Sequence, residues 1–138
     1  MNLIKSLRKI STENEFKNQC ENLIFKEAKN KEEANNYPYI KISKSVISIE
    51  KGAFANCESL KYIIIPNSAK SIGNYAFAHC ESLNSIIIPN SVTSIENDAF
   101  WNCKSLTSII IPNSVISIGK EAFAYCYNLT SIIIPNSV

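Results

Sequence analysis

The amino-acid sequence predicts a repeat solenoid, in which short coils stack on one another around one elongated apolar core. Three observations predict this fold class: an internal period of 23 residues, the same apolar residues at the same places in every period, and one β-branched run per period. Four units align without gaps, at residues 47–69, 70–92, 93–115 and 116–138. A unit this short cannot cover its own apolar side, so neighbouring units must stack.

Aromatic, thiol, aliphatic and proline residues recur in fixed columns of the four units. The columns contain Phe54, Phe77, Phe100 and Phe123; Cys57, Cys80, Cys103 and Cys126; Leu60, Leu83, Leu106 and Leu129; and Pro66, Pro89, Pro112 and Pro135. If each unit is one coil, the phenylalanines must lie in a single stacked file. The cysteines are predicted to be buried thiols, because cysteine behaves as a small buried apolar residue, with disulfides as an alternative.

Each unit has the pattern of one strand, one turn and one return segment. The isoleucine run at residues 63–65 favours a strand because it is β-branched. Pro66 has no amide to donate, and Asn67 begins a stretch with turn chemistry. The segment 53–60 has little β character and predicts a short helical or 3-10 return. The predicted fold therefore has a parallel β-sheet on one face, with short helical/3-10 returns behind it.

A half repeat precedes the four complete units. Residues 37–49 overlay residues 60–72 and supply a fifth strand-like segment, but they lack the Ala-Phe and Cys positions. The solenoid is thus predicted to cover residues 37–138, with about four and a half repeats. At a strand spacing of about 4.8 Å, the stack would be roughly 20 Å long.

Residues 1–36 are predicted to form a helical N-terminal cap, because a solenoid end exposes apolar edges and unpaired strand groups. Thr12 followed by Glu15 fits a capping box between two apolar stripes at helical spacing. The stripes contain Leu3, Ile4, Leu7 and Ile10, and then Phe16, Cys20, Leu23 and Ile24. Two alternatives to a lid are a helix that binds a partner or a membrane surface, and disorder.

Taken together, the columns resemble a known family. The pattern L-x-x-I-x-I-P-x-x-V-x-x-I-x-x-x-A-F-x-x-C, found over residues 37–138, is similar to the BspA-like class of leucine-rich repeats. The resemblance implies a leucine-rich repeat with the parallel β-sheet on the concave face. It also implies a surface or adhesion protein of a host-associated microbe, which binds other proteins. Serine replaces the Asn or Cys of the general pattern and could bond backbone groups between coils. This column contains Ser45, Ser68, Ser91, Ser114 and Ser137.

Side chains that alternate with the buried isoleucines are predicted to face outward on the concave sheet and to bind a protein partner. These residues are Lys41, Tyr62, Ile64, Ser85, Ile87, Ser108, Ile110, Ser131 and Ile133. A contiguous apolar strip on a soluble protein usually marks an interaction site. Isoleucine would equally raise strand propensity and pack across strands without any ligand, and contact with like chains is a third interpretation.

No residues with the spacing of a catalytic or metal site stand out in the sequence. Sulfurs on one zinc must lie within about 4 Å of each other, but the cysteine column would span about 14 Å. His79 has no acidic or nucleophilic partner at motif spacing, and the sequon at Asn128 includes Leu129, which should be buried. Trp101 replaces alanine in its column and either fills space or forms a local contact site. We therefore predict a protein that is not an enzyme, with no cofactor and no metal.

The net charge of +2 gives no reason to expect nucleic acid as a partner. No apolar run reaches the roughly 18–20 residues of a transmembrane segment, and the start lacks the apolar core of a secretory signal. These signs predict a cytoplasmic protein, whereas the family resemblance implies the cell surface. The sequence stops at Val138 without a cap. This predicts either a fragment of a longer array or self-association through the uncapped C-terminal coil.

Two classes of function follow from these observations. The first is a non-enzymatic protein-binding or adhesion module that uses the concave Ile/Ser face. The second is a structural, self-assembling repeat unit or a cytosolic scaffold. The sequence does not name a partner, because repeats specify a surface and not its ligand.

Overall fold

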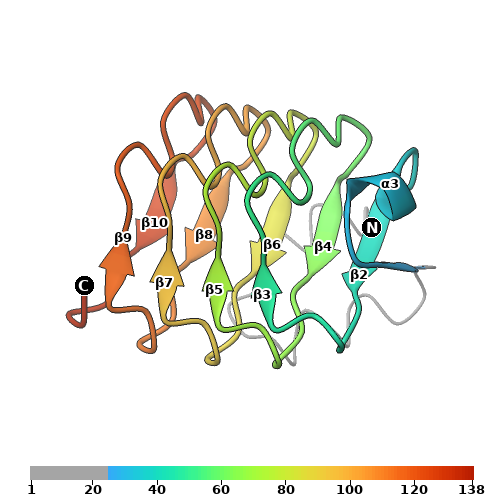
Figure 1. Cartoon of the computed structure of the whole chain (residues 1–138). Coiled ribbons are helices and arrows are strands. Elements are labelled where there is room, and N and C mark those ends of the chain that lie inside the picture. Colours follow the sequence, from blue (N-terminus) through green and yellow to red (C-terminus); the bar gives the residue numbers. More distant parts are fainter. Residues whose placement is uncertain (1–24) are drawn as a thin grey trace, which may run out of the picture.

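The computed structural model describes residues 25–138 of the chain, which form a parallel β-solenoid (Figure 1). The predicted solenoid is therefore confirmed. The main sheet contains β1 (Lys26–Ala28), β2 (Tyr39–Ile42), β4 (Tyr62–Ile64), β6 (Ser85–Ile87), β8 (Ser108–Ile110) and β10 (Ser131–Ile133). The second sheet contains β3 (Ser48–Ile49), β5 (Ser71–Ile72), β7 (Ser94–Ile95) and β9 (Ser117–Ile118). One short helix, α3 (Lys31–Ala34), precedes β2.

Both sheets stack with a constant offset from coil to coil. In the main sheet β4 pairs with β6 so that Tyr62 lies opposite Ser85, and in the second sheet β5 pairs with β7 so that Ser71 lies opposite Ser94. The ladders follow the orders β1-β2-β4-β6, β8-β10 and β3-β5-β7-β9. Within residues 25–138 no ladder joins β6 to β8, so the main sheet is hydrogen-bonded in two blocks.

The four phenylalanines form one stacked file in the interior. Ring centroids are 5.6 Å apart between Phe54 and Phe77, 5.3 Å between Phe77 and Phe100, and 5.3 Å between Phe100 and Phe123. The planes of neighbouring rings differ by 9°, 9° and 3°. The first three rings are fully buried, and Phe123 is half-buried. This file confirms the prediction that each unit is one coil of the solenoid.

The structure adds a second sheet to the single sheet that the sequence predicts. Each of its strands has only two residues, a serine followed by an isoleucine, as in Ser71–Ile72 of β5. The isoleucine is buried in the first three coils, and the hydroxyls of Ser48 and Ser71 lie 2.8 Å apart. A two-residue strand is too short to show an alternating pattern in the sequence. Its only signal is the Ser-Ile pair that recurs in every unit.

The return segments are successions of turns, so the predicted helical or 3-10 return is wrong. Each turn is closed by an amide that donates to the carbonyl three residues earlier, as Ala53 does to Glu50 at 3.1 Å. Gly52 and Asn56 stand at the third position of two such turns and have φ angles of 64° and 63°. A positive φ at this position is type II turn geometry, and it prevents successive turns from continuing as a helix.

Much of the predicted helical cap lies outside the described residues. Residues 1–24, with the capping box at Thr12 and the thiol of Cys20, belong to this part. The helical prediction finds no support in the rest of the cap, where β1 is a strand and α3 is a single turn. Residues 26–28 form a strand and not a helix because β1 pairs with β2, and this pairing gives its backbone groups hydrogen bonds.

β1 and α3 both attach to the first coil. β1 pairs with β2 so that Lys26 lies opposite Ile40, which adds one strand to the main sheet. Asn30 caps α3 by accepting a hydrogen bond from an amide of its first turn at 3.2 Å. The amide of Lys31 donates to the carbonyl of Ala53 at 2.7 Å. Within residues 25–138, no helix has the length and apolar character that crossing a bilayer requires.

The cysteine column lies along the core, and its four members are free thiols. The two central ones, Cys80 and Cys103, are fully buried, as predicted, and the two outer ones are half-buried. Cys80 Sγ donates to the Phe54 carbonyl of the preceding coil at 3.1 Å. The hydrogen bond with the thiol of Cys126, together with burial, raises the pKa of Cys103 well above its ordinary value. Cys103 therefore stays protonated and serves as a hydrogen-bond donor between coils.

The serine column connects coils in two of its positions. Ser68 and Ser137 each donate from Oγ to a carbonyl of the preceding coil at 2.7 Å. The hydroxyls of Ser91 and Ser114 are buried without such a bond among the described residues. The predicted role of serine between coils is thus confirmed for Ser68 and Ser137 only.

Candidate interaction surface on the main sheet

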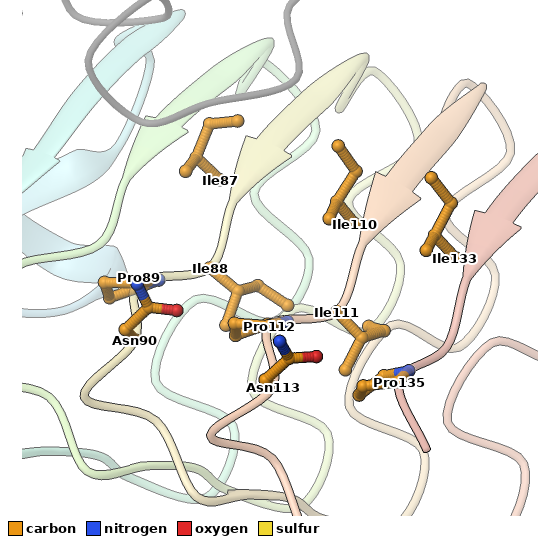
Figure 2. Close-up of a pocket in the computed structure, with 10 residues that line it drawn as sticks. All are labelled: Ile87, Ile88, Pro89, Asn90, Ile110, Ile111, Pro112, Asn113, Ile133 and Pro135. Carbon is orange, nitrogen blue, oxygen red and sulfur yellow. The ribbon is translucent and has the colours of Figure 1, made fainter. Parts of the chain in front are cut away.

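The outward isoleucines of the main sheet form one row across successive strands. In β6 and the residue that follows it, the exposed fraction is 2% for Ile86 and 5% for Ile88, whereas Ile87 between them is only half-buried. The predicted alternation is therefore present. The row consists of Ile64, Ile87, Ile110 and Ile133, and we call it the isoleucine strip. Figure 2 shows its last three members side by side on β6, β8 and β10.

Most of the predicted surface residues face outward. The first three isoleucines of the strip are half-buried, and Ile133 is 58% exposed. Lys41, at the corresponding position of β2, is exposed. Ser108 is half-buried and Ser131 is exposed. The outward side of the main sheet is thus most open in its last coil.

Tyr62 and Ser85 are buried, so their predicted exposure on the sheet is wrong. The exposed fraction is 0% for Tyr62 and 8% for Ser85. The Tyr62 ring stacks on the ring of Tyr39, with centroids 5.6 Å apart and planes 11° apart. Ser85 is the register partner of Tyr62, so its small side chain lies beside the large ring. Alternation assigns a side chain to one face of a sheet, but it does not say what packs against that face.

Two cavities lie at the carboxyl ends of the main-sheet strands. The cavity in Figure 2 has a volume of about 350 Å³. It is lined by Ile87, Ile88, Pro89, Asn90, Ile110, Ile111, Pro112, Asn113, Ile133 and Pro135. The other has a volume of about 740 Å³ and uses the same three residue types at Ile64, Pro66 and Asn67. Because the cavities lie on consecutive coils, we call them together the Ile-Pro-Asn groove.

The prolines and asparagines at this surface are not among the site residues predicted from the sequence. The signal for them is the order Ile-Pro-Asn directly after each strand, which recurs in every unit. Proline fixes its φ angle and so turns the chain in the same way in each coil. The asparagines that follow, Asn67, Asn90 and Asn113, are all exposed. Their amides form a polar border beside the apolar strip.

The charge of the groove changes along its length. Lys41, Lys44 and Glu27 line the cavity of the first coils, whereas the cavity in Figure 2 is lined only by uncharged residues. Among residues 25–138, no three His, Cys, Asp or Glu side chains come together to hold a metal ion. The groove therefore presents apolar side chains and asparagine amides along its length, with both signs of charge in the cavity of the first coils.

The stacked coils, the phenylalanine file and the Ile-Pro-Asn sequence that follows β4, β6, β8 and β10 define a leucine-rich repeat solenoid. The BspA type leucine rich repeat region matches residues 24–138 in six copies, and the chain therefore belongs to this family. Proteins of this class generally act as protein-interaction or surface modules. The match begins before residue 37, where the sequence predicts the start of the repeats, and it includes β1 and α3.

Solved structures of similar proteins share the fold. A leucine-rich repeat protein from Bacteroides ovatus is 43% identical over 71% of this chain, with a TM-score of 0.67. A leucine rich cell surface protein from Faecalibacterium prausnitzii is 36% identical over 78% of this chain, with a TM-score of 0.67. The pneumococcal vaccine antigen PcpA is 29% identical over 75% of this chain, with a TM-score of 0.71. This chain spans 25%, 29% and 25% of those three chains. A comparison with curated proteins gave no match.

Proposed function

We propose that this chain is a non-enzymatic protein-binding module whose partner docks on the isoleucine strip and the adjoining Ile-Pro-Asn groove. The observation that carries this proposal is the row of outward isoleucines, which occupies the same position on four strands of the main sheet. The strip lines the groove as well, so one partner segment can contact both.

Apolar burial is the main attraction that this surface offers. Each Å² of apolar area removed from water contributes about 25 cal/mol, whereas association itself costs at least about 4 kcal/mol. A partner must therefore cover several coils at once. Apolar side chains spaced at the coil repeat of about 4.8 Å would meet successive isoleucines. Lys41, Lys44 and Glu27 line one end of the groove, so polar or charged groups of a partner fit that end better than the uncharged cavity in Figure 2.

A role at a cell surface, in adhesion, is part of the proposal. It is supported by the relative from Faecalibacterium prausnitzii, which is described as a cell surface protein, and by PcpA, which is described as a vaccine antigen. A cytosolic scaffold is the alternative, and it would bind a partner from its own cell. Capture experiments on host-cell extract and on extract of the source cell separate the two roles.

The double variant Ile87→Lys with Ile110→Lys is expected to weaken partner binding at least about tenfold, because it places two unpaired ammonium groups inside the interface. The fold is expected to survive, since both side chains face outward and Lys41 already occupies the same position in β2. Pull-down from both extracts identifies the partner. Titration of the purified partner then measures the affinity of each variant.

Ile47→Lys with Ile116→Lys is the matched control. These isoleucines are 66% and 67% exposed but lie outside the strip, and Lys70 already occupies their column. The control is expected to bind like the unchanged chain, and circular dichroism checks that both variants are folded. Unchanged affinity in a folded strip variant would show that the partner binds elsewhere.

The alternative function, a structural unit that self-assembles, is supported by the apolar side chains of the last coil. Ile132 is 37% exposed, although its counterparts Ile86 and Ile109 are each 2% exposed. Ile134 is 51% exposed, whereas Ile88 and Ile111 are buried. A further coil stacked on β10 would cover these side chains. In this second proposal a second copy of the chain supplies that cover.

Self-association is expected to raise the apparent mass in sedimentation velocity as the protein concentration rises. Ile132→Lys is expected to suppress the increase, because it places a charge in the contact. Ile116→Lys is the control. Ile116 is 67% exposed, and Ile47 in the same column is 66% exposed although another coil follows it, so a stacked coil does not cover this position. A single monomeric species at high concentration contradicts this proposal for the chain.

A further inference from the structure

Four aromatic side chains form a second surface, separate from the isoleucine strip. They lie in the return segments, which line up along the top of the solenoid in Figure 1 and lead into the amino ends of the main-sheet strands. The Ile-Pro-Asn groove lies at the opposite, carboxyl ends of these strands. The four residues are His79, Trp101, Tyr125 and Tyr127, and we call them the aromatic row.

Neighbouring rings of the aromatic row contact one another, across coils from His79 to Trp101 to Tyr125 and within the last coil from Tyr125 to Tyr127. Centroids are 4.7 Å apart between His79 and Trp101, 5.4 Å between Trp101 and Tyr125, and 6.0 Å between Tyr125 and Tyr127. The ring planes differ by 82°, 85° and 75°, unlike the nearly parallel rings of the phenylalanine file. Edge-to-face contact leaves more of each ring face open than stacking does. Tyr125 and Tyr127 are 53% and 71% exposed.

Trp101 and Tyr127 depart from the residues that the repeat uses at their positions. The other complete units have alanine in the place of Trp101 and a charged residue, Glu or Lys, in the place of Tyr127. Those units close the same hydrogen-bonded turns without an aromatic side chain. The coil therefore does not require either ring, although both are found on the same part of the surface.

Tyr125 departs from its column in a further way. Its φ angle is 60°, in the left-handed region, and the same position in two other coils is held by Asn56 and Asn102. Asparagine adopts this conformation readily, whereas a bulky tyrosine does so at a conformational cost. The turn alone would favour asparagine. A tyrosine at this position is better explained by what its exposed ring contacts.

The charges beside the aromatic row are paired with each other. Lys104 Nζ lies 3.4 Å from Glu81 Oε1, and Asn102 Nδ2 donates to the same oxygen at 3.2 Å. Asn102 Nδ2 also lies 2.9 Å from Nδ1 of His79, which orients the imidazole at the end of the row. The surface thus combines open ring faces, tyrosine hydroxyls and an amide with a neutralised ion pair. This combination suits an uncharged ligand that has apolar C–H faces and a rim of hydroxyls.

We propose that the aromatic row is a binding site for a neutral oligosaccharide. A sugar ring can place its C–H face on a tyrosine or tryptophan ring while its hydroxyls bond to the polar groups at the edge. Rings from three successive coils extend over about 10 Å at the strand spacing of about 4.8 Å, so a chain of sugars fits better than one sugar. The proposal is independent of the function proposed for the isoleucine strip.

Trp101 is the only tryptophan of the chain, so its fluorescence reports directly on the proposed site. We expect at least one of cellohexaose, chitohexaose and maltohexaose to change the Trp101 emission of the full chain in a saturable way. Tyr125→Asn installs the residue that two other coils use, and Tyr127→Ala removes the most exposed ring. Each is expected to weaken oligosaccharide binding about three- to tenfold, since each removes one aromatic contact.

Tyr75→Asn is the matched control. Tyr75 is 44% exposed and has a φ angle of 56°, so it resembles Tyr125 but stands outside the aromatic row. Its variant, and the Ile87→Lys with Ile110→Lys variant, are expected to bind the oligosaccharide normally. The proposal is overturned if none of the three oligosaccharides gives a saturable change, or if Tyr75→Asn weakens binding as much as Tyr127→Ala does. Docking of a protein on the row in place of the oligosaccharides overturns it as well.

Discussion

Replacement of Phe77 by alanine is expected to lower the free energy of unfolding by about 3–5 kcal/mol, the usual loss when a buried phenylalanine is truncated. Phe77 is fully buried, and its ring stacks on Phe54 at 5.6 Å and on Phe100 at 5.3 Å. The flanking rings are held by the backbone of their own coils, so they are expected to fill the cavity only in part. In a solenoid each coil contacts only its neighbours. The cavity therefore weakens the packing of the coil that contains Phe77 against the coils on both sides of it.

Urea denaturation followed by circular dichroism measures this loss. Phe123→Ala is the matched control, because Phe123 is half-buried and stacks on Phe100 at one side. Its loss of stability is expected to be clearly smaller than that of Phe77→Ala. Equal losses at the two positions, or a loss below about 1 kcal/mol at Phe77, would contradict a core built on the stacked file.

Gly73→Ala is expected to cost about 1–3 kcal/mol, although it adds a single methyl group. A Cβ atom at Gly73 would lie 2.7 Å from the carbonyl oxygen of Ile49 and 3.0 Å from the carbonyl carbon of Glu50. Both atoms are backbone of the preceding coil and cannot rotate away. The amide of Gly73 donates to the same Ile49 oxygen at 2.8 Å, so separating the coils weakens this hydrogen bond. Thermal denaturation and hydrogen exchange of the Gly73 amide measure the two effects.

Gly52→Asn separates the steric effect from the conformational one. Gly52 has a φ angle of 64°, but no atom lies within 4 Å of a Cβ added there. Asparagine tolerates positive φ, so the stability of this variant is expected to stay within about 0.5 kcal/mol of the unchanged chain. If Gly52→Asn and Gly73→Ala lose stability equally, close approach of the coils is not the reason for glycine at position 73.

The coil could be predicted from the repeat period, because every coil packs nearly the same residues at the same positions. The phenylalanine file follows directly, since residues at one register position of stacked coils must be neighbours. The return segment could not be predicted in the same way. Its shape depends on positive φ angles at Gly52, Asn56 and their counterparts, and tyrosine and glutamate stand at some of those positions without any preference for such angles.

The residue types found at one position of the repeat do not reveal how closely the backbones of neighbouring coils approach each other at that position. Glutamate occupies the column of Gly73 in the coils on either side, at Glu50 and Glu96, so the sequence alone suggests that a side chain is tolerated there. The structure shows that the coil at Gly73 passes closer to its neighbour than a side chain permits.

The part of the candidate site that could be predicted is the set of strand residues that face outward, because side chains alternate between the two faces of a strand. Outward positions on strands of period two include Ile87 and Ile110, and the structure places both where the pattern predicts. The pattern could not reveal that Tyr62 is covered, because burial depends on three-dimensional neighbours such as Tyr39. It also gave no weight to the prolines and asparagines after each strand, since their role depends on the cavity that they enclose.

The constant offset between coils has a consequence for how such a chain can change in length. If residues 70–92 were removed, the ladder register would be kept, because Ser48 would face Ser94 in place of Ser71 and Ile49 would face Ile95 in place of Ile72. Removal of a single residue would instead rotate every later side chain out of its file. Genes for such chains can therefore gain or lose whole units by duplication and deletion, and the reach of the molecule changes in steps of one strand spacing, about 4.8 Å.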